Sequence, residues 1–294
     1  MTIDWTGQFL ETDELKIHYV RAGAGAPVVL LHGWPEFVRT WKHNLPVLAE
    51  HFDVIAPELR GFGETVSKVP RSAQGSTPQL LARDLKEFAD GLGLGRFAIV
   101  SHDVGAFVAQ TFALAYPERV SALFFFNCPY PGIGKRWGDP LLFGETWYQQ
   151  FHQKDFAARL VGSSREACRI YFQHFLQHWS HNPHAFDADL EAWVDNFLRP
   201  GNLQGGFDWY VGVSRFRRRM MVEGAPALAK IAAPTRFLWG AHDPVVRYEW
   251  ADKLADYFAD FELKPAPDAG HFVHYECPEL ANGEMVGFLG KVLG

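Results

Sequence analysis

One carboxylate stands where a sheet protein would present a reactive side chain. Asp103 follows the apolar run 97–100, within the segment Ser-His-Asp-Val-Gly at 101–105. Small residues two positions before and after a polar residue are typical of the nucleophile elbow, a sharp strand-to-helix turn that lifts one side chain above the sheet. The alternative is that Asp103 only caps the following helix, but two later motifs favour the nucleophile.

An acid and a base follow in later motifs. Asp243 comes after the apolar run 235–239, and His271 lies in a short loop between the run 261–265 and a terminal helix. Nucleophile, acid, base is one of the known chain orders of catalytic triads. We expect Asp243 to orient His271 and stabilise its positive charge, while His271 takes a proton from an attacking water.

The residue type at position 103 restricts the chemistry. A carboxylate that attacks an sp³ carbon opens an epoxide or expels a halide, and it leaves an alkyl ester that activated water can cleave at the carbonyl carbon. A serine in the same place would leave an ether, which water does not readily cleave. For the negative charge that develops at the carbonyl, we expect backbone N–H donors from Trp34 and Val104.

The elements that position these residues are short apolar runs alternating with helical patterns. Such runs are typical of buried parallel strands, and the alternation predicts a three-layer α/β core, with a mostly parallel sheet between two layers of helices. The expected strands are 16–21 (an edge strand), 27–31, 52–56, 97–100, 120–127, 235–239 and 261–265, and the expected helices among them are 78–91 and 106–116.

The character of the sequence changes between residues 129 and 225. Strand patterns stop, Pro and Gly mark both ends, and aromatic-rich helical segments take over. We predict that residues 1–128 and 226–294 form the core and that residues 129–225 form a helical cap over the pocket. The expected cap helices are 146–161, 165–179, 187–197 and 205–221.

Composition narrows the class of partner. The 294 residues are 48% hydrophobic and carry a net charge of −6, which suits a large core and gives no reason to expect a nucleic acid. No signal peptide and no membrane-length apolar run is apparent, so a cytoplasmic protein is expected. Part of the aromatic content, 15% of the chain, is expected to line the pocket. These pocket side chains are Trp34, Phe107, Trp147 and Trp209.

Three further features are interpreted as structural. Three widely spaced cysteines match no disulfide framework and no metal site. His174 and His178 have a helical spacing that can bind Zn²⁺, but they lack an accompanying acid motif, and packing is favoured. Four arginines form a basic cluster that is predicted to be a solvated helix face: Arg215, Arg217, Arg218 and Arg219.

Over nearly its whole length the chain resembles the epoxide hydrolase branch of the α/β-hydrolase superfamily. The motifs that carry the resemblance are HGWPE at 32–36, LRGFGE at 59–64, SHDVGA at 101–106, WGAHDP at 239–244 and GHF at 270–272. The resemblance implies conversion of a small apolar or amphipathic epoxide to a vicinal diol by water, without a metal or organic cofactor. It leaves a homodimer open.

In that family two cap tyrosines donate hydrogen bonds to the epoxide oxygen, and Tyr148 and Tyr210 resemble them. Because an alkoxide is a poor leaving group, a phenol O–H that shares its charge assists ring opening. Two positions depart from the family pattern. Val104 stands where Trp often follows the nucleophile, which leaves the pocket shape open, and Ser101 replaces the usual first glycine of the elbow.

Two other functions remain open. A haloacid or haloalkane dehalogenase would use the same nucleophile. Fluoroacetate dehalogenases, however, place arginines shortly after it, where this chain has Val104 and Phe107, and they tend to carry His-Trp where this chain has Tyr148-Gln149. Haloalkane dehalogenases often bind halide through a Trp next to the nucleophile. The alternative of another class is a non-catalytic ligand-binding protein on the same fold, which the presence of all three triad candidates disfavours.

Overall fold

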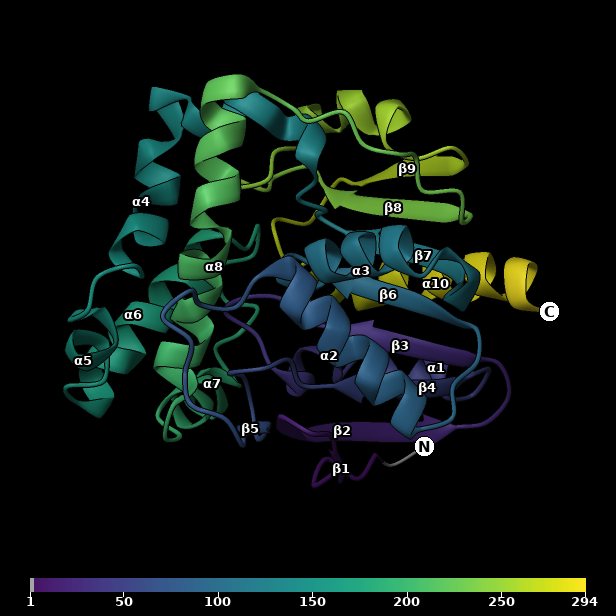
Figure 1. Ribbon diagram of the computed structural model, residues 1–294, viewed down its shortest axis with the longest axis horizontal. Helices are drawn as coiled ribbons and strands as arrows, with labels where there is room; N and C mark the ends of the chain where they lie inside the picture. The colour runs from purple at the N-terminus through teal and green to yellow at the C-terminus, as the bar shows by residue number, and fades with distance from the viewer. Residues whose placement is uncertain (1–2) are drawn as a thin grey trace.

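The computed structural model describes residues 3–294, with a single nine-stranded sheet at its centre (Figure 1). The strand order is β1-β2-β4-β3-β6-β7-β8-β9, and β5 pairs with β2 outside this path. In chain order the strands are β1 (Gln8–Glu11), β2 (Leu15–Gly23), β3 (Pro27–Leu31), β4 (Asp53–Pro57), β5 (Val66–Ser67), β6 (Phe97–His102), β7 (Val120–Phe126), β8 (Thr235–Gly240) and β9 (Phe261–Ala266).

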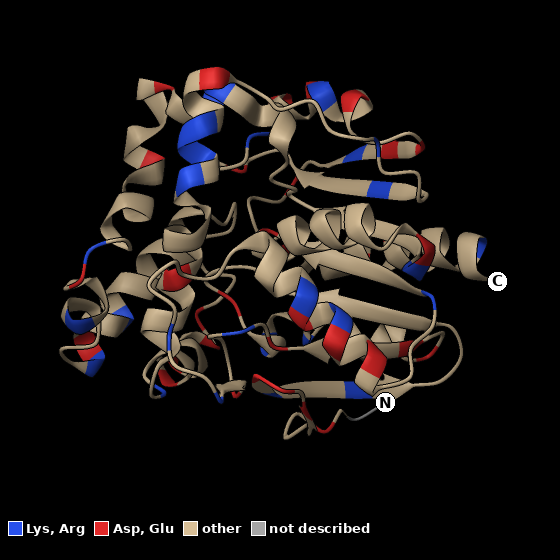
Figure 2. Ribbon diagram, viewed as in Figure 1, with Lys and Arg blue, Asp and Glu red and all other residues tan. Residues whose placement is uncertain are grey.

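The strands from β4 to β9 along this order run parallel, whereas the pairs of β2 with β1, β4 and β5 are antiparallel. The central strands β3, β6 and β7 contain no charged residue and are buried almost throughout. Charges lie mainly on helices and loops (Figure 2). Continuous apolar strands of this kind are stable only when helices cover both faces of the sheet.

Helices form the two outer layers. Helices α2 (Pro78–Gly91) and α3 (Val104–Ala115) pack together on one face, and α1 (Leu45–Leu48) and α10 (Pro278–Leu293) pack together on the other (Figure 1). Helix α2 begins where its sequence predicts, since the Thr77 side chain accepts the Leu80 N–H and Pro78 occupies the first turn. The predicted three-layer α/β-hydrolase fold is confirmed.

Between β7 and β8 the chain leaves the sheet and forms helices over the carboxyl ends of the parallel strands (Figure 1). These helices are α4 (Phe143–Phe151), α5 (Ala157–Val161), α6 (Arg165–His178), α7 (Leu190–Phe197) and α8 (Asn202–Glu223). No helix within residues 3–294 is long and apolar enough to span a bilayer.

Two expectations about elements are wrong. The strand predicted at an edge, β2, lies inside the sheet, because β1 flanks it; the mostly exposed β1 has too little apolar pattern to be recognised from sequence. The single helix predicted over 146–161 is interrupted between α4 and α5. At this interruption His152 turns inward, where its Nε2 lies 2.6 Å from the Tyr171 hydroxyl and its ring stacks on Phe207. Tertiary contacts therefore outweigh the local helical pattern there.

The contact between α3 and β3 depends on Gly105, because a Cβ at this position would lie 2.4 Å from the Leu31 carbonyl oxygen. Gly105→Ala is therefore expected to lower the free energy of unfolding by about 1–3 kcal/mol, measured by urea denaturation. Gly287→Ala, on the exposed side of α10 with open space around it, is the control and should stabilise by up to about 1 kcal/mol. Equal stability of Gly105→Ala and the native protein would contradict the close helix–strand contact.

Candidate active site

Asp103 lies on a strained turn between β6 and α3. Its backbone has φ 46° and ψ −111°, a region that non-glycine residues rarely adopt and that is maintained only where the surroundings enforce it. Gly33 is part of those surroundings, since a Cβ there would come within 2.5 Å of the Asp103 Cβ. The turn raises the carboxylate above the carboxyl end of β6, as expected of a nucleophile elbow.

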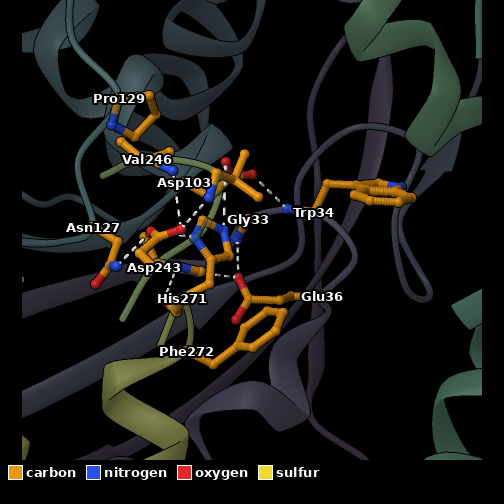
Figure 3. A network of polar contacts seen from close by, with 12 residues as sticks. Gly33, Trp34, Glu36, Asp103, Asn127, Pro129, Asp243, Val246, His271 and Phe272 are labelled. Atoms are coloured by element: carbon orange, nitrogen blue, oxygen red, sulfur yellow. Dashed lines mark hydrogen bonds and ion pairs between the residues drawn. The ribbon is translucent and has the colours of Figure 1, made fainter. Parts of the chain in front are cut away.

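The two oxygens of the Asp103 carboxylate face different groups (Figure 3). Oδ1 accepts a hydrogen bond from the Trp34 backbone N–H at 3.0 Å. Oδ2 lies 3.9 Å from Nε2 of His271, beyond hydrogen-bond length. The Asp103 side chain is 19% exposed, whereas that of His271 is 1% exposed. The nucleophile candidate is therefore reachable, while the base candidate is buried behind it. Val104, the second expected N–H donor, is the first residue of α3.

His271 is held by the carboxylate of Asp243. The Nδ1–H of His271 donates to Asp243 Oδ2 at 2.7 Å, and Asp243 Oδ1 accepts the backbone N–H groups of Val245 and Val246 at 2.8 and 2.9 Å. Burial alone would raise the pKa of Asp243, but the charge and hydrogen bond of His271, the Asn127 amide and the Val246 N–H hold it below its usual value.

Neighbouring negative charges favour the protonated form of His271. Burial acts to lower the pKa of His271, but the carboxylate of Asp243, with a smaller contribution from Asp103, raises it to about 9. The imidazole is therefore cationic at neutral pH as long as both carboxylates are charged.

Asn127, which the sequence motifs do not single out, follows β7 in a left-handed conformation with φ 41°. Its side-chain amide donates to Asp243 Oδ2 at 2.6 Å and to the Gly270 carbonyl at 3.2 Å, while its Oδ1 accepts the Gly240 N–H at 3.1 Å. Asn127 thus joins the strand ends that carry the acid and the base. A polar residue at the carboxyl end of a parallel strand was the only sequence signal for it.

A buried group behind the nucleophile was missed as well. The carboxylate of Glu36 accepts hydrogen bonds from Thr40 Oγ1 at 2.6 Å and from His102 Nδ1 at 2.8 Å, and His102 Nε2 donates to the His271 carbonyl at 2.9 Å. Burial would raise the pKa of Glu36, yet the charges of His102 and His274 keep it well below its usual value. His102 therefore lies between Glu36 and the backbone of His271, with both ring nitrogens used in hydrogen bonds.

Glu36, His102 and His274 are also the only group of described side chains with the proximity of metal ligands. Glu36 lies 2.8 Å from the ring nitrogen of His102 and 3.0 Å from that of His274. Two ligands on a tetrahedral Zn²⁺ would lie farther apart, at about 3.4 Å. The three residues fit a hydrogen-bonded network better than a metal site.

Glu276 connects the loop of His271 to the segment that follows α6. Its Oε1 accepts the N–H groups of Gly270 and Phe272 at 3.0 and 3.2 Å, and its Oε2 accepts that of His181 at 2.6 Å. The His271 N–H itself donates to the Trp179 carbonyl at 2.8 Å. The backbone N–H groups of His271 and of the residues on either side of it are therefore all hydrogen-bonded, which fixes the position of the imidazole.

Aromatic side chains of the cap helices pack against Trp34, whose backbone N–H bonds to Asp103. The indole of Trp34 stacks on the ring of Tyr148 with centroids 5.2 Å apart, and the rings of Tyr148 and Tyr210 meet edge to face at 5.3 Å. Tyr148 and Tyr210 are buried. Burial is the main cause that raises the pKa of both phenols, and the Asp103 charge adds to it. Both hydroxyls therefore keep their protons at neutral pH.

Of the other pocket candidates, Phe107 and Trp209 are buried and pack together at 5.7 Å, joining α3 to α8. The expectation for Trp147 is wrong. Its side chain is 43% exposed and stacks on Phe175 at the outer side of α4. Successive helical residues point about 100° apart, so a helix that directs Tyr148 inward directs Trp147 away.

A family model of the alpha/beta hydrolase fold matches residues 26–278. The chain belongs to this family. It is 30% identical over 288 residues to the soluble epoxide hydrolase of Corynebacterium sp. (strain C12), which covers 94% of each protein. It is 26% identical to epoxide hydrolase 1 of Caenorhabditis elegans, over 98% of this chain and 71% of the relative.

The solved structure of epoxide hydrolase CorEH without ligand superposes with a TM-score of 0.82, with 28% identity over 97% of this chain and 98% of that one. These similarities place the hydrolase in the epoxide hydrolase branch of the family. The resemblance drawn from the five sequence motifs is confirmed.

In this hydrolase, Asp243→Asn removes the main charge that raises the pKa of His271, so burial should then dominate. We expect the pKa to fall from about 9 to below the usual 6.5. The measurement is a pH titration of ¹⁵N-labelled histidine side chains by NMR, with the His271 signal assigned by its loss in His271→Gln. Asp252→Asn, whose carboxylate pairs with Arg136 at the surface, should leave the value near 9. An unchanged value in Asp243→Asn would refute this account of the charge balance.

Proposed function

We propose that this hydrolase converts an epoxide to a vicinal diol through a covalent ester on Asp103. The observation that carries the proposal is the strained elbow residue, a carboxylate with one oxygen on a backbone N–H and the other facing a buried imidazole. A carboxylate so placed can attack carbon and be regenerated by hydrolysis, because the ester it forms has a carbonyl that water can attack.

The two oxygens of Asp103 suit different roles in the first step. Oδ2, which accepts no short hydrogen bond from described residues, attacks an epoxide carbon, and the C–O bond of the ring breaks. Tyr148 and Tyr210 donate to the ring oxygen as its negative charge develops, and one of them supplies its proton. Oδ1 becomes the ester carbonyl oxygen, already hydrogen-bonded to Trp34 N–H.

Ester formation allows His271 to change from a cation to a neutral base. Asp103 loses its negative charge on alkylation, and this charge is one cause of the raised pKa of His271. The pKa of His271 therefore falls in the intermediate, and the proton that it releases restores the tyrosine that protonated the ring oxygen. The neutral imidazole can then take a proton from water. The oxygen of this water adds to the ester carbonyl, and the N–H groups of Trp34 and Val104 stabilise the oxyanion. The bond between the carbonyl carbon and Oδ2 then breaks, and Oδ2 leaves as a diol hydroxyl with the proton that His271 had taken. The water oxygen remains on Asp103, whose carboxyl group returns its proton to His271.

We further propose that residues 1–128 and 226–294 act as the catalytic core and that residues 129–225 act as a cap. Two contacts support this division. The cap supplies both tyrosines, and its Trp179 carbonyl anchors the His271 N–H. The cap would then exclude water from the opening ring and also fix the base.

Styrene oxide tests the proposed reaction. The native protein should release phenylethane diol, and Asp103→Asn should lower the rate by about a thousandfold or more in a fresh preparation free of deamidation. Asp13→Asn, an exposed aspartate remote from the site, is the control and should keep full activity. Faster halide release from fluoroacetate or chlorobutane would favour a dehalogenase, and binding without turnover of any of these would favour a ligand-binding protein.

Loss of the base should separate the two chemical steps. His271→Gln retains Asp103 and both tyrosines, so it should form the ester but not hydrolyse it. Mass spectrometry of the intact protein after incubation with styrene oxide should then show a stable increment of one substrate mass, and proteolytic digestion should locate it on the peptide that contains Asp103. His184→Gln, at an exposed histidine of the cap, should show no increment. An unmodified His271→Gln protein that still turns over substrate would rule out this role.

A further inference from the structure

The outer surface of the cap exposes a large share of the apolar side chains that reach solvent. Within residues 3–294, 14 large apolar side chains are exposed, and seven of them lie between residues 141 and 222, which is less than a third of the chain. The two most exposed are Leu141 at 82% and Val222 at 75%. Single exposed apolar residues are common on protein surfaces, but a group of them marks an interaction site.

Helix α4 has an exposed stripe that is mainly apolar. Phe143, Trp147 and Gln150 follow one another at intervals of four and three residues, so they share one face of the helix. All three are exposed, Phe143 by 59%, whereas Tyr148 on another face is buried. The stripe therefore turns toward solvent and away from the proposed reaction site.

Helix α8 has an exposed stripe that is mainly basic. Arg215, Arg218 and Val222 lie three and four residues apart, and all three are exposed. Figure 2 shows positive charge along this C-terminal half of the helix. Within residues 3–294, no ion pair is found for Arg215 or Arg218, whereas the nearby Arg219 pairs with Glu223 at 2.6 Å. Two arginines of the stripe are therefore available to an anionic partner.

The two stripes adjoin. Gln150 of the α4 stripe and Arg218 of the α8 stripe line one small cavity between the helices. In the segment before α4, a Cβ at Gly138 would lie 3.3 Å from the Met221 Cβ. Figure 1 shows the N-terminal end of α4 beside the C-terminal end of α8. Together the stripes form one surface, the outer cap patch, which consists of Phe143, Trp147, Gln150, Arg215, Arg218 and Val222.

The outer cap patch is positive although the whole chain has a net charge of −6. Neither stripe contains an acidic residue. Of the acidic residues close to them in sequence, Glu223 pairs with Arg219, and Glu145 lies 2.7 Å from Nε2 of His178. Asp139 caps the helical turn that precedes α4. At physiological salt, charges more than about 8–10 Å away are largely screened, so a partner of this patch must offer both negative charge and apolar surface.

We propose that the outer cap patch docks on an anionic lipid bilayer. Such a bilayer offers both components, since its headgroups attract arginine and the boundary between headgroups and acyl chains accepts aromatic and aliphatic side chains. A second copy of this chain fits the patch less well, because a two-fold axis would place the same patch on both sides and bring like charges together. The inference goes beyond the proposed function and does not rest on it.

Vesicle sedimentation tests the docking without turnover. The full chain is mixed with sucrose-loaded vesicles of phosphatidylcholine, or of an equimolar mixture of phosphatidylcholine and phosphatidylglycerol, and the bound fraction is measured over a range of lipid concentrations. Each arginine near the headgroups should raise the affinity about fivefold, so the protein should bind the anionic vesicles about 25-fold more tightly than the neutral ones. Added salt should reduce this difference.

Substitutions separate the two components of the binding. Arg218→Gln should weaken binding to the anionic vesicles about fivefold, and the double variant Arg215→Gln/Arg218→Gln should lose most of the preference for them. Phe143→Ser should weaken binding about 5- to 10-fold through lost apolar burial. Arg39→Gln and Phe9→Ser, at an exposed arginine and an exposed phenylalanine of the core, are the matched controls and should bind as the native protein does. Because all these side chains are exposed, each variant should keep the native unfolding temperature.

The indole of Trp147 reports whether the patch enters the bilayer. Anionic vesicles with brominated acyl chains should quench part of the tryptophan fluorescence of the native protein. Trp147→Phe should lose this quenching, because no other tryptophan belongs to the outer cap patch.

Three results would overturn the inference. The first is a native protein that does not bind the anionic vesicles. The second is binding that Phe143→Ser or the double arginine variant leaves unchanged, or that does not quench Trp147, because contact would then occur through another surface or through charge alone. The third is a dimer, measured by light scattering without lipid, that Phe143→Ser dissociates, because a second copy would then cover the patch.

Discussion

The backbone turn at Asp103 is the constraint on which the rest of the site depends. A φ of 46° is unfavourable for a residue with a Cβ, and here it directs a carboxylate off the end of β6 toward a backbone N–H on one side and an imidazole on the other. The neighbouring chain makes room for it at Gly33 and Gly105, where any side chain would collide with Asp103 or with β3. Local strain is thus maintained by close packing of β3, β6 and α3.

Buried and partly buried carboxylates hold the parts of the site in place. Asp243, Glu36 and Glu276 each accept several N–H or O–H donors. Asp243 bonds to His271 itself and Glu276 to the peptides next to it, whereas Glu36 acts through His102, which bonds to the His271 carbonyl. A buried carboxylate is costly unless such donors satisfy it. Their common effect is that the imidazole has little freedom of position, although its loop contains Gly270. This preorganisation suits a base that must act on an intermediate formed on another residue.

Charge changes during the proposed reaction explain why one histidine can serve both steps. With Asp103 charged, the pKa of His271 lies near 9, and the cation helps to stabilise the attacking carboxylate. Once the ester has formed, one of the charges that favour the proton is gone. Arg217 was expected on a solvated helix face, but its side chain is 7% exposed. The charge of Arg217 acts to lower the pKa of the Tyr148 and Tyr210 phenols, which in the proposed reaction share charge with an alkoxide.

The sequence by itself determined the fold class and the positions of the six parallel strands among the nine in the sheet. It also determined the candidates Asp103, Asp243 and His271. These follow from local patterns: an apolar run marks a buried strand, and the first polar residues after it lie at the carboxyl edge of the sheet. Only the tertiary structure decided which cap side chains face the site. Tyr148 is buried whereas its sequence neighbour Trp147 is 43% exposed, and Arg217 is buried among three exposed arginines. The roles of Asn127, Glu36 and Glu276 also depended on the structure, because each acts through contacts with segments distant in the chain. A residue's own neighbours in sequence do not specify such contacts; the packing of the cap against the sheet does.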